Sequence, residues 1–193
     1  VHPPLLYEDR NEGIIKGIYP IIKPTKNKKN KVQLLASGSM VNEIIKAAKL
    51  LKDDWNIEAS IWSVTSYSEL HKEAEDIRRW NILHPKSKPR KSFLEKMIKK
   101  PNGPVIAVSD YVKLVSEQIA PYIKCPFVAL GTDGFGRSDT RENLRNFFEV
   151  NRYYIILYAL DKLAVDGKIS KNKVDNCIKK YKIDFNKPNP NKV

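Results

Sequence analysis

Four short apolar runs, each followed by a polar turn and then by residues with helical spacing, constrain the fold of this chain most strongly. The runs cover residues 32–36, 59–64, 105–108 and 127–130. Runs of this length are typical of buried strands. Strands that alternate with helices indicate βαβ units, whose right-handed crossovers place helices on both faces of a mostly parallel sheet. The pattern therefore predicts a three-layer α/β domain with one sheet.

Polar and small residues mark the expected ends of the helices. Ser39 is a predicted N-cap for the helix that follows the first strand. Asp139 and Glu142 have the spacing of a capping box at the start of a later helix. Gly167 is expected to end a long helix, and Ser170 is expected to cap the last one. A helix is thus predicted after each strand, followed by two further helices at the C-terminal end.

The first 30 residues differ from the rest in pattern. Their one apolar stretch, residues 14–22, is interrupted by Gly17 and Pro20 and is followed by a run of lysine and asparagine. We therefore predict an extended lead-in or linker over residues 1–30 and one α/β domain over residues 31–193. Because the sequence begins at valine, we also expect a fragment or a processed product.

The formal net charge of +13 raises the possibility of a nucleic-acid partner. The densest basic segment, residues 23–31, alternates lysine with asparagine and lacks the aromatic and arginine side chains that stack on bases or read them. The other basic residues are spread along the chain among acidic ones. We interpret the charge as solvated surface and expect neither a nucleic-acid partner nor a membrane partner, since no apolar run approaches the ~18 residues of a membrane span.

Cysteine and histidine have no metal-binding spacing in this sequence. Cys125 and Cys177 are far apart, and the three histidines form no HxxxH or HxH pair. Lone cysteines of this kind are typical of reduced, buried positions. The sequence therefore predicts no zinc site and favours a cytoplasmic location.

In open α/β sheets, ligands collect beyond the carboxyl ends of the strands. Those ends are predicted at residues 37–39, 65–66, 109–110 and 131–139, all rich in small or polar side chains. Tight turns into helices require the same residue types, so turn geometry alone is an alternative explanation. The glycine fingerprints of dinucleotide and P-loop sites and the GxSxG of hydrolases are absent.

The segment GTDGFGRSD at residues 131–139 is the most informative of these ends. Its glycines indicate special backbone geometry around an aromatic side chain. Arg137 provides a fork of donors for a carboxylate, either Asp133 in a local ion pair or a group from another domain. The residues that we assign to an interface or active-site edge are Asp133, Gly134, Phe135, Gly136, Arg137, Asp139 and His84, the last as an interface histidine.

GTDGFGRSD and the residues that follow it, up to the FEV at 148–150, resemble the terminal portion of the homodimeric, acetyl-transferring pyruvate dehydrogenases. Further matches occur in the order of that family from about residue 2 to the C-terminus. They are EGI and KGIY at 12–19, QLL and SGS at 33–39, SVTSYSEL at 63–70, RWN and LHP at 79–85, and SDY and KL at 109–114.

The resemblance implies a large thiamine-diphosphate enzyme of the transketolase-like group. Its members decarboxylate pyruvate and pass the acetyl group to a lipoyl arm on an acyltransferase partner. This chain is similar to the third domain, which has a sheet of about five strands and extends the dimer contact, while the other domains hold the thiamine diphosphate and magnesium. The diphosphate-binding signature of the family has no counterpart here. We therefore expect no catalytic residue and no bound cofactor in this chain alone.

Two other classes of function stay open on the sequence. A free-standing α/β module would bind a small molecule at the carboxyl ends of the strands. A basic nucleic-acid-binding protein would use the charge of +13.

Overall fold

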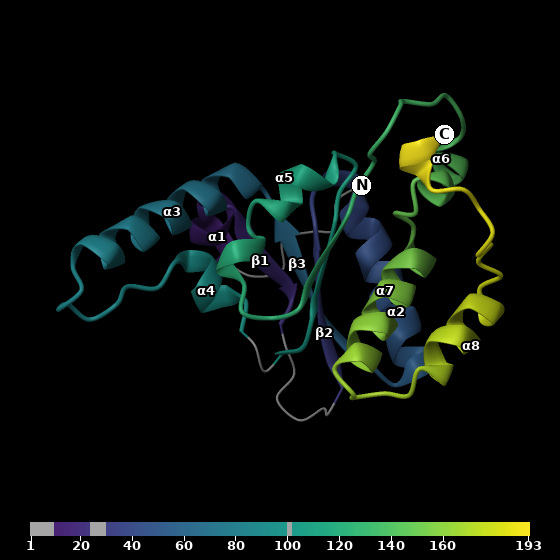
Figure 1. The fold of residues 1–193 in the computed structure, drawn as a ribbon, viewed down its shortest axis with the longest axis horizontal. Helices are drawn as coiled ribbons and strands as arrows, with labels where there is room; N and C mark the ends of the chain where they lie inside the picture. Colours follow the sequence, from purple (N-terminus) through teal and green to yellow (C-terminus); the bar gives the residue numbers. More distant parts are fainter. Residues whose placement is uncertain (1–9, 24–29, 100–101) are drawn as a thin grey trace.

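The computed structural model describes residues 10–23, 30–99 and 102–193 and shows one five-stranded sheet with helices on both faces (Figure 1). The strands are β1 (Ile18–Ile22), β2 (Lys31–Ala36), β3 (Glu58–Val64), β4 (Val105–Val108) and β5 (Phe127–Leu130). Their order is β1-β3-β2-β4-β5, with β1 antiparallel to β3 and the other pairs parallel. The predicted three-layer, mostly parallel α/β fold is confirmed, and the four predicted strands are β2 to β5.

Helices cover both faces of the sheet (Figure 1). On one face lie α2 (Val41–Trp55), α7 (Arg152–Val165) and α8 (Asn172–Lys180). On the other lie α3 (Tyr67–Leu83), α4 (Phe93–Met97) and α5 (Lys113–Glu117). At the margins are α1 (Arg10–Lys16), which packs on β1, and α6 (Arg141–Phe147). Short 3-10 helices occur at η1 (Gly38–Met40), η3 (Ala120–Tyr122) and η4 (Pro190–Lys192).

Each face of the sheet has its own hydrophobic core. Leu34 and Ile106 point into the core beneath α2 and α7, whereas their neighbours Leu35 and Val105 point into the core beneath α3 and α4. All four side chains are fully buried. Successive side chains of a strand face opposite sides, so strands buried on both faces are mostly apolar. This is why the continuous apolar runs in the sequence located these strands.

The first part of the chain differs from the predicted extended lead-in. Residues 10–16 form α1, and residues 18–22 form β1, which pairs with β3 at one edge of the sheet. Pro20 lacks a backbone donor, and an edge strand tolerates it because only one side of the strand is paired. The sheet thus begins inside the segment predicted as a linker, whereas residues 1–9 and 24–29 lie outside the described residues.

Two of the predicted helix caps are wrong. Ser39 lies within η1, and α2 begins after Met40, which makes no side-chain cap bond. The N-cap of α6 is Thr140, whose hydroxyl accepts from the backbone N–H of Asn143. Asp139 lies one residue earlier and accepts from the N–H of Thr140. Several polar side chains lie close together at both sites, and the backbone conformation decided which of them became the cap.

The two other predicted helix ends lie close to their expected positions. Gly167 directly follows the C-cap of α7 with a φ of +67°, so it ends that helix as predicted. The N-cap of α8 is Lys171, but the preceding Ser170 hydroxyl accepts from the N–H of Asn172 and thus partly fills the capping role.

Both cysteines are buried and in the thiol form, as predicted. Burial raises the pKa of the Cys177 thiol to about 12, so it stays protonated at neutral pH. Within residues 10–23, 30–99 and 102–193, no helix has both the length and the apolar character needed to cross a bilayer.

Candidate functional site

A cavity of about 620 Å³ lies beyond the carboxyl ends of β2, β4 and β5. Three of the four predicted strand-end loops contribute to it, namely 37–39, 109–110 and 131–139. Its lining consists of Ser39, Met40, Asp110, Thr132, Gly134, Phe135, Gly136, Arg137, Asp139, Arg141, Leu144, Arg145, Phe148 and Val150.

The fourth loop, at the end of β3, does not reach this cavity. The backbone N–H groups of Thr65 and Ser66 donate to the carbonyl of Gly17, and the Thr65 hydroxyl donates to the carbonyl of Ile14. These bonds connect the loop to the turn between α1 and β1. Because β1 adds an antiparallel strand beside β3, this strand end has a structural partner instead of an open edge.

The buried carboxylate of Glu43 supports the cavity through two arginine side chains. Glu43, in the first turn of α2, is 2% exposed. One of its oxygens accepts from Arg145 Nη1 at 3.0 Å and from Arg152 Nη2 at 3.1 Å, and the other accepts from the Nε (3.0 Å) and the backbone N–H (3.1 Å) of Arg152. A buried charge needs such a set of partners, since desolvation without them is costly. The three residues connect α2 with α6 and α7.

This ionic cluster extends to the cavity wall. Arg145 Nη2 donates to the hydroxyl of Ser39 at 3.0 Å, and that hydroxyl donates to Asp110 at 3.3 Å. Ser39 and Asp110 come from the ends of β2 and β4. The hydroxyl predicted to cap a helix is thus a link between two strand-end loops.

The first half of the 131–139 loop is fixed to the neighbouring loop after β4. Thr132 donates its backbone N–H to the carbonyl of Tyr111 and its hydroxyl to the carbonyl of Asp110. Asp133 accepts from the backbone N–H of Lys113 at 2.8 Å, and its other oxygen lies 3.6 Å from the ammonium group of that lysine. Asp133 therefore holds the start of α5. It does not pair with Arg137, so of the two partners considered for that arginine the local one is wrong.

The second half of the loop is open in its centre and fixed again at its end. Phe135 is 85% exposed. The guanidinium of Arg137 lies 4.3 Å from the centroid of the Phe147 ring, a cation–π contact. Asp139 accepts from the Asn143 side chain and the Thr140 N–H, and these bonds lower its pKa below the ordinary value.

His84 lies apart from the other predicted site residues. It follows α3, whose C-terminal end projects at the left of Figure 1, at the opposite end of the long axis from the 131–139 loop. Its ring stacks on Trp80 at 4.3 Å, and its Nδ1 lies 2.8 Å from the Trp80 carbonyl oxygen. The structure therefore brings together Gly134, Phe135, Gly136, Arg137 and Asp139 at the cavity, whereas Asp133 binds Lys113 and His84 lies away from it.

Sequence reasoning missed Glu43, Arg145 and Arg152 as a cluster. One signal was present, since Glu43 lies on the same helical stripe as Met40 and Ala47, which are buried. A carboxylate on an apolar stripe indicates a buried partner, but the sequence does not say which arginine supplies it.

Comparison with known proteins agrees with this architecture. A family described as "Transketolase-like TK C-terminal domain" matches residues 17–151. Three curated proteins named "Pyruvate dehydrogenase E1 component" are similar to this chain. Those of Cupriavidus necator, Pseudomonas aeruginosa and Escherichia coli K12 are 50%, 46% and 43% identical over 94%, 97% and 98% of the chain. The chain spans 20–21% of the length of these relatives.

Solved structures share the fold at low identity. A transketolase from Campylobacter jejuni matches 83% of this chain and 20% of its own with a TM-score of 0.54, and one from Pichia stipitis matches 81% and 19% with a TM-score of 0.57. Both are 19% identical to this chain. With the family match over residues 17–151 and the five-stranded sheet, these similarities identify this chain as a member of the transketolase-like C-terminal domain family.

Proposed function

We propose that this chain is the C-terminal structural and dimerisation domain of a pyruvate dehydrogenase E1 component. That enzyme would decarboxylate pyruvate with thiamine diphosphate and transfer the acetyl group to a lipoyl group. The observation that carries the proposal is the 43–50% identity to proteins of that name, which extends over at least 94% of the chain. In this proposal the chain alone catalyses nothing.

The donor groups of this chain support the assignment of catalysis to other parts of the enzyme. Magnesium in a thiamine-diphosphate site prefers several oxygen ligands. Within the described part of the chain, no three or more Asp, Glu, His or Cys side chains form a group that could hold a metal ion. In this proposal the remaining domains bind the cofactor with its metal.

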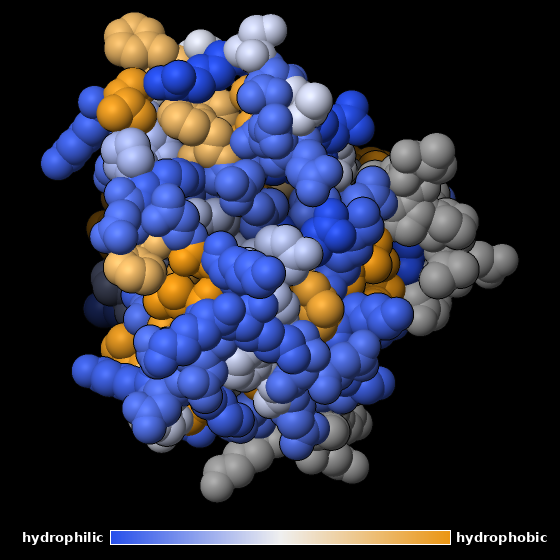
Figure 2. Space-filling model, turned by 90° about the vertical axis from the view of Figure 1, so that its right-hand side faces the viewer, coloured by the Kyte–Doolittle hydropathy of each residue, from blue (hydrophilic) through white to orange (hydrophobic). Residues whose placement is uncertain are grey.

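The cavity edge is the surface that we propose for contact with the rest of the enzyme, including its second subunit. Phe135 extends into solvent there, and Figure 2 shows apolar atoms at the upper edge of a face that is otherwise largely hydrophilic. An exposed aromatic side chain near a guanidinium group is typical of interface centres. The lipoyl acyltransferase would be a partner of the complete enzyme, in the cytoplasm.

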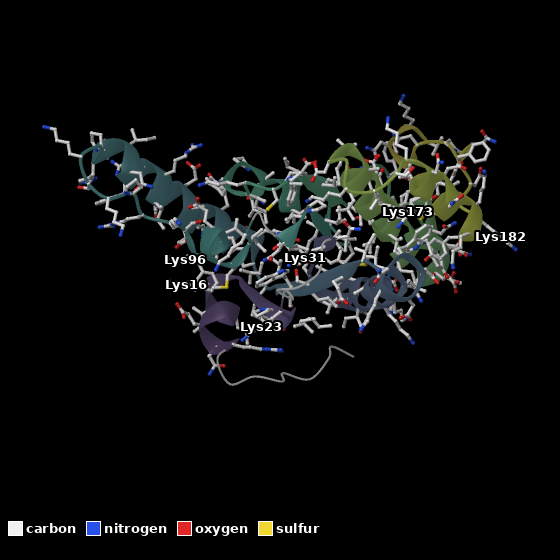
Figure 3. The ribbon with its side chains drawn as sticks, turned by 90° about the horizontal axis from the view of Figure 1, so that it is seen from below. Lys16, Lys23, Lys31, Lys96, Lys173 and Lys182 are labelled. Atoms are coloured by element: carbon white, nitrogen blue, oxygen red, sulfur yellow. The ribbon has the colours of Figure 1, made fainter. Side chains whose placement is uncertain are left out.

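The positive charge supports no separate nucleic-acid function. Figure 3 labels lysines that come from several elements and lie along the length of the molecule, from α4 to α8. They are Lys16, Lys23, Lys31, Lys96, Lys173 and Lys182. A dispersed arrangement fits solvated surface better than a groove that follows a phosphate backbone.

Calorimetry tests the assignment of the cofactor. Thiamine diphosphate with magnesium, titrated into this chain, is expected to give no saturable heat. Saturable, magnesium-dependent binding with a dissociation constant in the micromolar range would contradict the proposal.

Substitution of Arg137 tests the proposed interface. Arg137→Ala in the full-length enzyme is expected to weaken dimerisation or turnover, since loss of a charged contact at an interface costs about 2–5 kcal/mol. The isolated chain should lose only about 0.5–1 kcal/mol, the value of an exposed cation–π contact. Lys49→Ala, on an exposed position of α2, is the matched control and should change neither. Unchanged dimerisation and turnover in the Arg137 variant would show that this edge is not the interface.

A further inference from the structure

The cavity at the carboxyl edge has the size and the wall of a small-molecule site. Its volume of about 620 Å³ is within the range of roughly 300–1,000 Å³ that such sites have. Met40 and Val150, each 1% exposed, form part of the wall with the partly buried Leu144 and Phe148. An apolar wall of this kind suits an organic ligand better than a hydrated ion.

Two of the cations at this cavity have no carboxylate partner in the structure. Arg145 and Arg152 share the single carboxylate of Glu43. Arg137 and Arg141 also belong to this edge and line the cavity, but they make no ion pair with any residue in the described ranges. A guanidinium group offers a planar fork of donors that matches a phosphate or a carboxylate.

The carboxylates of the cavity do not cancel this positive charge. Asp110 accepts from Ser39, and Asp139 accepts from Asn143 and from the Thr140 N–H. With Glu43 they make three carboxylates, against four guanidinium groups, so one net positive charge is left. Because Asp110 and Asp139 already accept hydrogen bonds within the protein, an anion would meet mainly the two unpaired arginines.

The aromatic ring of Phe135 forms the remaining part of the wall. Phe135 is 85% exposed and lies between Gly134 and Gly136, of which Gly136 has open space around it. Gly134 lies against the Pro190 carbonyl, so a turn of the ring toward the cavity would take place at Gly136, since glycine permits a wide range of backbone angles. Such a ring would stack on a planar group of a ligand.

We propose that this cavity binds a small organic anion that joins a planar apolar group to a phosphate or a carboxylate. Arg137 and Arg141 bind the anionic group, Phe135 covers the planar group, and the wall around Met40 and Leu144 contacts the rest of the ligand. Phe135 and Arg137 also belong to the interface proposed above, so the ligand site is tested by binding to this chain alone, whereas the interface is tested by dimerisation and turnover of the full-length enzyme.

Titration with simple probes tests the site in the 193-residue chain, whose sheet carries its own core on each face. Phenyl phosphate, benzoate, inorganic phosphate and phenol would be titrated while ¹H–¹⁵N chemical shifts are followed. Phenyl phosphate is expected to saturate with a dissociation constant of about 1 mM or below and to shift signals of the cavity residues. Phenol, which lacks the anion, and inorganic phosphate, which lacks the ring, should bind about tenfold or more weakly. Benzoate binding more tightly than phenyl phosphate would identify a carboxylate ligand, and weaker binding a phosphate ligand.

Two variants connect that binding to the proposed residues. Arg141→Ala should weaken phenyl phosphate binding about tenfold, and Phe135→Ala should weaken it about threefold. Both positions are exposed, so both variants should keep the circular dichroism spectrum of the parent chain. Lys49→Ala removes a positive charge elsewhere and should bind like the parent. The absence of saturation by about 10 mM phenyl phosphate would overturn the proposal, as would unchanged binding in Arg141→Ala.

Discussion

Two loops of this molecule place an arginine over an aromatic ring, but they differ in how they are held. In the loop over residues 84–92, the Arg90 guanidinium lies 3.7 Å from the centroid of Trp80. His84 stacks on the same ring, and Asn81 both donates to the Arg90 carbonyl and accepts from its N–H. Two groups at these distances cannot share one face of an indole, so Trp80 lies between them. This loop is closed by its own contacts.

The loop over residues 131–139 is fixed at its ends only. Asp133 holds one end to α5, and Asp139 holds the other to α6. Between them Phe135 is exposed, and the Arg137 contact with Phe147 is 4.3 Å. The difference shows that an arginine–aromatic contact does not by itself define a role. A loop whose contacts are internal is a structural element, whereas one with an open centre has groups left for a partner.

The largest effect is expected at the cluster of Glu43, Arg145 and Arg152, which supports the loop over residues 131–139. Glu43→Gln removes the charge that Arg145 and Arg152 share, and breaking a buried pair costs about 3 kcal/mol or more. Urea denaturation of the chain measures this loss in the free energy of unfolding. Glu117→Gln, an exposed carboxylate on α5, is the matched control and should stay within about 0.5 kcal/mol of the parent. A loss below about 0.5 kcal/mol for Glu43→Gln would show that the Glu43–Arg145–Arg152 cluster does not support the cavity edge.

A pair of glycine substitutions should separate the fixed part of the loop from its open part. Gly134 has a φ of +93°, and an added Cβ would lie 2.9 Å from the Pro190 carbonyl oxygen. Gly134→Ala should therefore destabilise the chain by about 1–2 kcal/mol. Gly136→Ala meets no atom within 4 Å and should change the free energy of unfolding by less than about 0.5 kcal/mol. Equal losses in thermal denaturation would mean that the centre of the loop is not open.

Loss of the hydrogen bonds between Asn81 and Arg90 should make the loop over residues 84–92 as open as the loop over residues 131–139. Asn81→Ala removes two hydrogen bonds to Arg90 and should cost about 1 kcal/mol. Amide hydrogen exchange should become faster over residues 84–92 but not over residues 131–139. Asn172→Ala, at an exposed position in α8, is the control. Unchanged exchange at Arg90 would indicate that the stacking on Trp80 alone holds this loop.

The smallest expected effect concerns pH and the fixed end of the second loop. Hydrogen bonds from Asn143 and Thr140 favour the ionised form of Asp139 and lower its pKa. Because the pKa of Asp139 is lower in the folded chain, its ionised carboxylate stabilises the fold at pH values above its pKa in the unfolded chain. This stabilisation is lost as the pH falls through its pKa in the folded chain. Carboxyl NMR should show Asp139 titrating below a typical aspartate, and Asn143→Ala should move its pKa upward. An unchanged pKa in that variant would argue against the bond.

The sequence determined most of the architecture. Strands buried on both faces are mostly apolar along their length, so β2 to β5 were visible as local runs. The sequence did not show β1, because Gly17 and Pro20 interrupt its apolar stretch and its pairing partner β3 lies about 40 residues away. An edge strand is defined by that pairing and not by a local pattern.

The candidate site, like the fold, was predicted from the sequence only in part. Glycine spacing and the GTDGFGRSD segment located the loop at residues 131–139 from the sequence alone. Only the tertiary structure decided that Asp133 binds Lys113 instead of Arg137, and that His84 lies at the other end of the molecule. It also decided that Glu43 meets Arg145 and Arg152, which are 102 and 109 residues away. The physical reason is that apolar burial is recorded in each strand as a local pattern, whereas the partner of a charged side chain depends on which distant segments fold against it.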